Sequence, residues 1–177
     1  PVYTRGVSSP DRISIDQLRR FVVARQGYGA SRVAGRDAVA AAIRRMQSLP
    51  LDSISAVERA HRLTLGSRIG SYPRDSENRL IAEGRIFEYW AHEACLLAIE
   101  DFPLMQRRMH EHRDRHWWGR ERTERGLEEE VLAILREQGP LPARAFEGSN
   151  APGEMWGWKP AKRALEHLFA GGEVTIA

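Results

Sequence analysis

The sequence predicts a mainly α-helical protein with small β-hairpins, organised as tandem winged helix-turn-helix units. Three observations lead to this fold class. Apolar residues recur at helical spacing in successive segments, and two short aromatic and aliphatic segments at 85–91 and 94–100 are typical of a hairpin that follows these helices. The second half of the chain then repeats the plan of helices followed by a strand.

The first two helices are indicated by their caps and by their apolar spacing. Ser14 and Gln17 fit a capping box, and the helix that they start is expected to stop at Gly27. Asp37 is a candidate cap for a second helix, whose apolar residues continue as far as Met46.

Two further helices precede the hairpin. Ser55 and Glu58 form another capping-box pattern, so we expect a third helix over about 56–68. A short helix near 75–83 should end at Gly84, because glycine commonly closes a helix.

The second half of the chain is charged at first and then amphipathic. A helix over 128–138 is closed by Gly139, and residues 140–148 supply a short second helix. Pro160 starts a third helix, and residues 173–177 are typical of a strand. The side chains expected to face inward from that third helix are those of Ala161, Ala164, Leu165 and Leu168.

We therefore expect three parts in the chain. A first winged-helix unit spans 1–100, a highly charged helical connector spans 101–125, and a second winged-helix unit spans 126–177. A wing is a hairpin, and the predicted strand at 173–177 has nothing after it to pair with. We expect the chain to be a piece of a longer protein, truncated within this wing.

The composition is that of a soluble globular protein. Hydrophobic residues make up 42% of the chain, charged residues make up 29%, and the mean hydropathy is −0.50. No apolar run approaches the ~20 residues of a membrane helix, and the first residues lack the apolar stretch of a signal peptide. We expect a cytoplasmic protein with no membrane partner. The single cysteine, Cys95, lies in an apolar run, which excludes an internal disulfide and favours a buried thiol.

The basic residues are almost all arginine. Of the 27 basic residues, only Lys159 and Lys162 are lysine. The planar fork of arginine suits phosphate contacts and favours a nucleic-acid partner, whereas the base composition of a genome would produce the same skew. Both explanations stay open, because the 24 acidic residues are interspersed and no solid basic block is present.

Three strings together resemble one family in their order and spacing. They are LDSISAVERAHRLTLGSRIGSYP from Leu51, FEYWAHEACLLAIEDFPLMQRRM from Phe87 and EMWGWKPAKRALEHLF from Glu154. The chain resembles the bacterial winged-helix DNA glycosylases of the AlkZ/YcaQ type, which unhook interstrand crosslinks and excise bulky alkylpurines. The resemblance implies double-stranded DNA with alkylated or crosslinked purines as the partner, in the bacterial nucleoid. Members are longer, with a third winged helix and a C-terminal β-barrel, which agrees with the unpaired strand.

The resemblance also implies a catalytic residue. The catalytic motif of the family is glutamine, an apolar residue, and then aspartate or glutamine, which falls on Pro50, Leu51 and Asp52. Hydrolysis of an N-glycosidic bond passes through an oxocarbenium-like state, so Asp52 is implied to orient a water and to stabilise positive charge. An alkylated N7 is already positively charged, so no general acid is needed.

Two features of the motif leave alternatives open. Pro50 stands where the family has glutamine, and proline offers neither a side-chain amide nor a backbone N–H. Gln47 is the nearest amide, but its position need not direct it to the same place. Aspartate before serine is also a common capping and turn pair, so Asp52 is a candidate for catalysis, for starting a helix, or for both.

Further residues are candidates for contact with DNA. The segment beside Asp52 would border the active site, and its candidates are Ser53, Ser55, Arg59, His61, Ser67 and Arg68. His92 lies between the predicted hairpin strands, where either DNA contact or a turn with an internal hydrogen bond explains it. In the second unit, Lys159, Lys162 and Arg163 lie opposite the apolar face, where a recognition helix would meet the DNA backbone. A solvated helix face is the alternative for each of them.

We predict no cofactor and no metal site. His112 and His116 are one helical turn apart, but no cysteine and no obvious further ligand accompanies them. An exposed, charge-paired helix with Glu111 and Arg115 at the i,i+4 spacing is the preferred interpretation.

Our interpretation is a DNA-repair glycosylase that acts as a monomer and hydrolyses the bond between deoxyribose and a damaged purine. Two alternatives remain. One is a relative that binds DNA but has lost catalysis through Pro50. The other is a winged-helix transcriptional regulator, for which a homodimer would match a two-fold operator.

Overall fold

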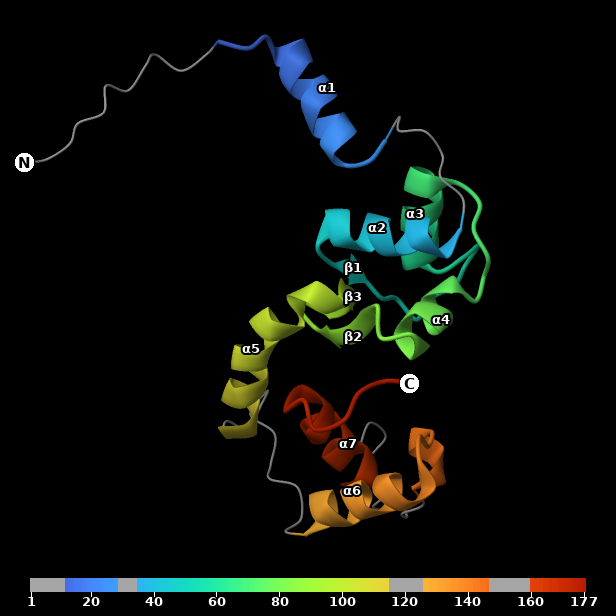
Figure 1. The fold of residues 1–177 in the computed structure, drawn as a ribbon, viewed down its shortest axis with the longest axis vertical. Coiled ribbons are helices and arrows are strands. Elements are labelled where there is room, and N and C mark those ends of the chain that lie inside the picture. Colours follow the sequence, from blue (N-terminus) through green and yellow to red (C-terminus); the bar gives the residue numbers. More distant parts are fainter. Residues whose placement is uncertain (1–11, 29–34, 115–125, 147–159) are drawn as a thin grey trace, which may run out of the picture.

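The computed structural model describes residues 12–28, 35–114, 126–146 and 160–177, and the structural statements below concern those residues. Seven α-helices and one small antiparallel sheet form the fold (Figure 1). This confirms the mainly helical class. The elements are α1 (Ile15–Arg25), α2 (Arg36–Met46), β1 (Leu49–Pro50), α3 (Ala60–Ile69), α4 (Ser76–Ala82), β2 (Ile86–Trp90), β3 (Ala94–Ala98), α5 (Phe102–Asp114), α6 (Leu127–Gln138) and α7 (Pro160–Ala170), with short 3-10 helices at Ile99–Asp101 and Ala143–Ala145.

The sheet contains the predicted hairpin and one strand that the sequence analysis missed. β2 and β3 pair antiparallel from Ile86 opposite Ala98 to Trp90 opposite Ala94, as expected for 85–91 and 94–100. β1 pairs with the other edge of β3, so the strand order is β1-β3-β2. Pro50 is tolerated there because β1 is an edge strand, where a missing N–H costs least.

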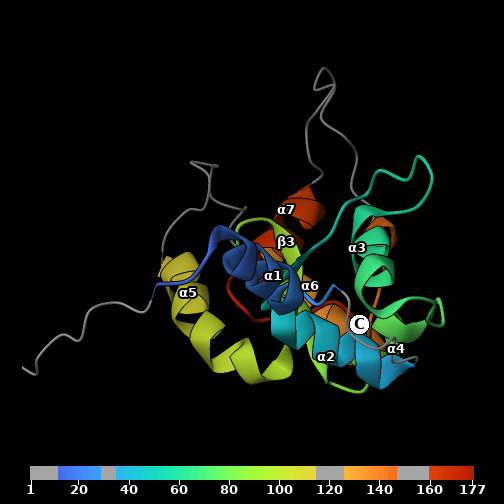
Figure 2. The ribbon, with the colours of Figure 1, turned by 90° about the horizontal axis from the view of Figure 1, so that it is seen from above.

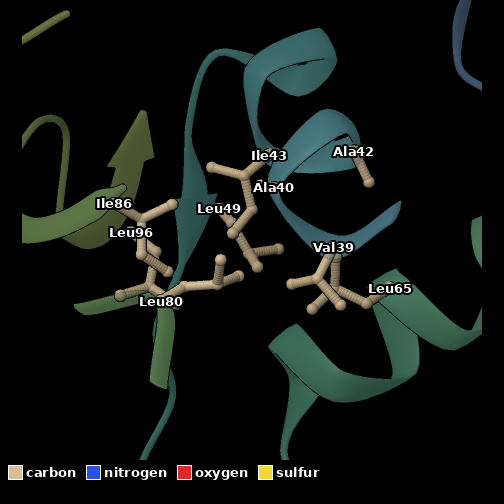
Figure 3. Packing of buried hydrophobic residues seen from close by; sticks show 9 residues of the cluster. All are labelled: Val39, Ala40, Ala42, Ile43, Leu49, Leu65, Leu80, Ile86 and Leu96. Atoms are coloured by element: carbon tan, nitrogen blue, oxygen red, sulfur yellow. The ribbon is translucent and has the colours of Figure 1, made fainter. Parts of the chain in front are cut away.

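A first core lies where α2, α3 and α4 pack against the sheet (Figure 3). Val39 and Ile43 are fully buried at the i,i+4 spacing that predicted this helix. The other buried members of this cluster come from α2, β1, α3, α4, β2 and β3, and are Ala40, Ala42, Leu49, Leu65, Leu80, Ile86 and Leu96.

α1 forms as predicted, but it stands outside this core. Its capping box is present, since Gln17 N–H donates to Ser14 Oγ at 3.1 Å and Ser14 N–H donates to Gln17 Oε1 at 2.8 Å. No residue of α1 is buried, and Figure 1 shows the helix apart from the other elements. The chain after it is attached to α3, because Arg68 Nε donates to Gln26 O at 3.0 Å and the Arg68 guanidinium lies over the Tyr28 ring at 4.8 Å.

α7 connects a second core to the sheet. Ala164 and Leu168 pack with Val131 of α6, while Ala161 and Leu165 lie partly buried at the same cluster, as the predicted inward face requires. Phe169 belongs to a third cluster together with residues of β2, β3 and α5. α7 therefore lies between α6 and the sheet, as Figure 1 also shows.

Two of the predicted helix starts are wrong. α3 begins at Ala60 rather than near residue 56, and the capping box of Ser55 and Glu58 does not form. The Glu58 carboxylate instead accepts bonds from Arg59 N–H at 3.1 Å and from the Arg74 guanidinium at 2.6 Å. Asp37 lies inside the first turn of α2 rather than at its cap, which is Gly35 with φ of 106°.

Two predicted elements near the end of the chain are also corrected. In the described part of 140–148, the short helix is only the 3-10 turn Ala143–Ala145. Residues 173–177 form no strand. Glu173 N–H and Gly172 N–H instead donate to Leu168 O at 2.8 Å and Phe169 O at 3.0 Å, so this backbone closes α7 in a Schellman motif.

The predicted division into 1–100, 101–125 and 126–177 stays a prediction. The connector is helical in α5, while its remainder, 115–125, lies outside the described residues. Within the described ranges, none of the helices has the length and apolar character needed to cross a bilayer.

Candidate functional site

The candidate site is built on loop 51–59, which joins β1 to α3. Leu51 N–H donates to Ala94 O at 2.8 Å, so pairing with β3 continues one residue beyond β1. Asp52 is then the first residue to leave the sheet. Figure 2 shows the loop leaving the body of the protein before it returns at α3.

Asp52 shapes a turn and does not cap a helix. Its carboxylate is exposed, and Asp52 Oδ1 accepts a hydrogen bond from Ile54 N–H at 2.8 Å. This two-residue pattern is an Asx turn, and α3 begins only at Ala60. The bond restrains the carboxylate relative to the loop backbone, while no hydrogen bond from a described residue reaches the other oxygen.

The sheet register brings Asp52 to the turn of the hairpin. Leu49 pairs with Leu96 and Pro50 pairs with Cys95, so continuing the register places Asp52 opposite Glu93. The backbone of Asp52 therefore leaves the sheet beside the turn between β2 and β3, although some forty residues of sequence separate them. Sequence reasoning missed this juxtaposition because β1 has only two residues.

The hairpin turn contains His92 and a buried thiol behind it. Ala91 N–H donates to Glu93 O at 2.9 Å, which is the internal hydrogen bond proposed as one explanation of this turn. His92 is exposed, and its Nδ1 lies 3.9 Å from Cys95 Sγ. Cys95 is fully buried, as predicted, and this burial raises the pKa of its thiol. His92 is accessible to a partner that approaches Asp52.

The rest of the loop offers groups suited to an anion. Ser53 and Ser55 are exposed, and so is Arg59, whose guanidinium makes no ion pair with a described residue. Arg59 is also the N-cap of α3, and no side chain caps this helix start. Free N–H groups at a helix start and a nearby arginine both favour a phosphate.

Comparison with protein families identifies the class to which these residues belong. The model of the family described as "DNA glycosylase AlkZ-like" matches residues 43–177. The chain belongs to the AlkZ-like DNA glycosylase family. The match includes loop 51–59, the hairpin and α7, and it leaves out α1. Among solved structures, the comparison found no match.

Membership confirms the resemblance drawn from the three sequence strings. DNA glycosylases act on DNA, so the family implies DNA binding and a role in DNA repair. A candidate residue of this AlkZ-like protein can therefore contact DNA only if its side chain is free to reach it.

His61 is placed in the interior of this AlkZ-like protein. It is 5% exposed, and burial lowers the pKa of its imidazole, opposed in part by the nearby Glu77 carboxylate. Glu77 is also 5% exposed, accepts the Tyr72 hydroxyl at 3.0 Å and lies 3.8 Å from the Arg62 guanidinium. This burial argues against a phosphate contact by His61 and for a role in packing at the start of α3.

The next two candidates on α3 bond to the protein itself. Ser67 is exposed, and its hydroxyl donates to Thr64 O at 2.8 Å. Arg68 donates to Gln26 O and Thr64 O and lies over Tyr28. The guanidinium of Arg68 thus holds the chain after α1, and a phosphate would have to compete with these contacts.

Two of the three candidates of the second half, Lys162 and Arg163, lie on α7. Lys162 is exposed and Arg163 is half-buried, whereas Lys159 lies outside the described residues. Lys162 and Arg163 belong to a helix that packs on α6 and the sheet rather than to loop 51–59.

The histidines of α5 lack the surroundings of a metal site in the part of the chain that the structure describes. There, no cluster of three or more possible ligands is present. His116 and Arg115 lie outside that part, and the i,i+4 ion pair observed on α5 joins Arg107 Nε to Glu111 Oε1 at 3.1 Å. Burial lowers the pKa of His112.

Proposed function

We propose that this AlkZ-like protein hydrolyses the N-glycosidic bond of alkylated or crosslinked purines in double-stranded DNA. The observation that carries the proposal is the exposed Asp52 carboxylate, bonded to Ile54 N–H beside the hairpin turn in a chain of this family. Asp52 orients the attacking water and stabilises the oxocarbenium-like state. The protein acts as a monomer in the bacterial nucleoid.

The chemistry requires only one carboxylate. Water attacks C1′ of the deoxyribose as the bond to the purine breaks. The electrons of that bond neutralise the positive charge of the alkylated N7, which makes the base a good leaving group, and the proton of the water passes by way of Asp52 to solvent. Oδ1 of Asp52 is engaged by Ile54 N–H, so Oδ2 is the atom assigned to the water. A turn that holds the carboxylate in place reduces the reorganisation needed at the moment of reaction. The residues in hand require no metal or cofactor for this step.

Phosphate contacts near the reacting sugar come from the rest of the loop. Ser53, Ser55 and Arg59 supply hydroxyls and a cation, and His92 supplies a further contact from the hairpin turn. On α7, Lys162 and Arg163, with Lys159 before them, extend the interface along the DNA backbone. His61 is left out of this set because it is buried.

We infer that both halves are winged helix-turn-helix units. The order α2-β1-α3-α4-β2-β3, with the sheet order β1-β3-β2, supports this for the first unit and makes the hairpin its wing. In the second unit, α6 and α7 supply the corresponding helices. In this arrangement Asp52 immediately follows the first strand, where it can face DNA that contacts the wing.

Pro50 supports an alternative in which the protein binds damaged DNA without cleaving it. Pro50 is exposed on edge strand β1, where glutamine fits without loss of a sheet partner. The effect of Pro50→Gln on base release therefore separates an active enzyme from a relative that has lost catalysis.

The test is base release from a duplex that contains N7-methylguanine. Abasic sites are detected by strand cleavage in alkali after incubation with the full chain. The proposal predicts release by the wild type on the damaged duplex and none on undamaged DNA. If the wild type is inactive and Pro50→Gln activates it, the protein is a relative that binds damaged DNA but has lost catalysis. If neither the wild type nor Pro50→Gln releases a base, and the protein gives a sequence-specific footprint on undamaged DNA, the protein is a transcriptional regulator.

A further inference from the structure

Two apolar side chains stand in solvent beside the candidate carboxylate. Ile54 is 72% exposed and Val57 is 91% exposed, the highest fraction among the large hydrophobic residues that the structure describes. A single exposed aliphatic residue is ordinary on a protein surface. Two in one loop, within five residues of Asp52, give this loop an apolar tip that no described residue covers.

The turn at Asp52 links this apolar tip to the candidate carboxylate. Asp52 Oδ1 accepts the N–H of Ile54 itself, so the hydrogen bond that restrains the carboxylate also fixes the backbone from which the Ile54 side chain projects. Any group that contacts Ile54 is therefore held close to Asp52.

The polar residues around the tip favour DNA as the group that covers it. Ser53 and Ser55 flank Ile54, and the unpaired guanidinium of Arg59 follows Val57 at the start of α3. The one acidic side chain between Val57 and Arg59 is already neutralised, since Glu58 accepts the Arg74 guanidinium at 2.6 Å. An apolar tip flanked by groups that bind phosphate is the pattern of proteins that insert side chains between base pairs.

We propose that Ile54 and Val57 insert into the duplex at the damaged nucleotide and unstack it, acting as a wedge beside Asp52. The proposal rests on the proposed function and deepens it, because it assigns residues that open the DNA around the reacting sugar. Stacked bases shield the sugar, and a damaged base pair is the cheapest to unstack, so the wedge would also favour damaged DNA.

The experiment measures unstacking without base release. The duplex carries a hydrolysis-resistant fluorinated analogue of N7-methylguanine next to the fluorescent base 2-aminopurine, whose emission rises when its neighbour unstacks. The full chain is compared with the double variant Ile54→Ser, Val57→Ser. The control is Leu104→Ser, because Leu104 is 70% exposed on α5, outside the loop. All three substitutions are at exposed positions, and equal unfolding midpoints would show intact folds.

The wild type and the control are expected to raise the emission on saturating DNA binding, and the double variant to lose most of that rise. The double variant should also lose preference for damaged over undamaged duplex by about 10-fold. An equal rise in the double variant would overturn the wedge. So would base release by the wild type on the natural lesion without any rise on the analogue, a result that leaves the proposed function intact. A wedge-dependent rise without base release would contradict only the proposed function.

Discussion

Single residues decide what loop 51–59 can do, and Asp52 is the clearest case. The sequence predicted Asp52 as a candidate through its family motif, and predicted equally that it starts a helix. The observed Asx turn replaces the helix cap and leaves the carboxylate exposed. Neither Ile54 nor Val57 was singled out, because isolated aliphatic residues between serines have no periodicity that predicts burial or exposure.

The burial of His61 could have been predicted from the sequence pattern. His61 lies four residues before Leu65, and both side chains are buried on one face of α3. Residues at this spacing share a face of a helix, so Leu65 indicated that His61 faces the interior rather than a DNA phosphate. The carboxylate of Glu77, which lies near His61 in the fold, comes from α4 and could not be assigned from sequence spacing.

The burial of His61 predicts a pH dependence of stability. Its folded pKa lies below the ordinary 6.5, so the unfolded chain binds more protons between these two values. The free energy of unfolding therefore has its full value above about pH 6.5. It decreases as the pH falls from 6.5 toward the pKa of His61 in the folded protein. Burial is the largest cause of the lowered pKa of His61. The nearby charges act in both directions, since the carboxylates of Glu77 and Glu58 raise this pKa and the guanidinium groups of Arg62 and Arg59 lower it.

Urea unfolding between about pH 7.5 and 5 measures this effect. In His61→Gln, the free energy of unfolding should decrease less toward low pH than in the wild type. Part of the decrease should remain, because the pKa of His112 is also lowered. Identical slopes in the two proteins would contradict the assignment to His61.

Among the elements, α1 and α2 show why periodicity alone could not define the core. Both have apolar residues at helical spacing, and both form helices close to the predicted ranges. α2 buries five residues, whereas the apolar side chains of α1 remain exposed. The difference arises from tertiary contacts, which spacing does not encode, and the family match also begins inside α2, at residue 43.

Matched truncations in these two helices test the difference. Ile43→Ala removes a fully buried side chain and should lower the free energy of unfolding by ~2–5 kcal/mol. Phe21→Ala removes a larger side chain that is 61% exposed and should change it by about 0.5 kcal/mol or less. Equal losses in chemical denaturation would mean that α1 packs on the core.

At the scale of the whole molecule, α7 joins the two halves. The Tyr89 hydroxyl donates to Ala170 O at 2.7 Å in the interior, and Phe169 packs near the Tyr89 and Trp90 rings. The sequence predicted two units in series and the inward face of α7, but not this contact, because the partners are about eighty residues apart. The chain after α7 closes that helix and contacts α5, which accounts for the missing strand at 173–177.

Gly172 tests this junction. A Cβ on Gly172 would lie 2.6 Å from Met109 Sδ and 3.0 Å from Met109 Cγ, and φ is 74°. Gly84 has a similar φ of 65° with open space around it, so Gly84→Ala reports backbone strain alone. Gly172→Ala should destabilise the protein by ~1–3 kcal/mol more than Gly84→Ala, because the buried Met109 side chain of α5 must move to make room for the new methyl group. Equal thermal midpoints for the two variants would refute this junction.

The most direct test of the account is the rate of base release by Asp52→Asn. Asparagine keeps an oxygen that can accept the Ile54 N–H, so the turn is preserved while the negative charge is lost. The account predicts release of N7-methylguanine at least ~10²-fold slower than by wild type, at saturating protein and with unchanged DNA affinity. Release at the wild-type rate would show that Asp52 does not carry the chemistry.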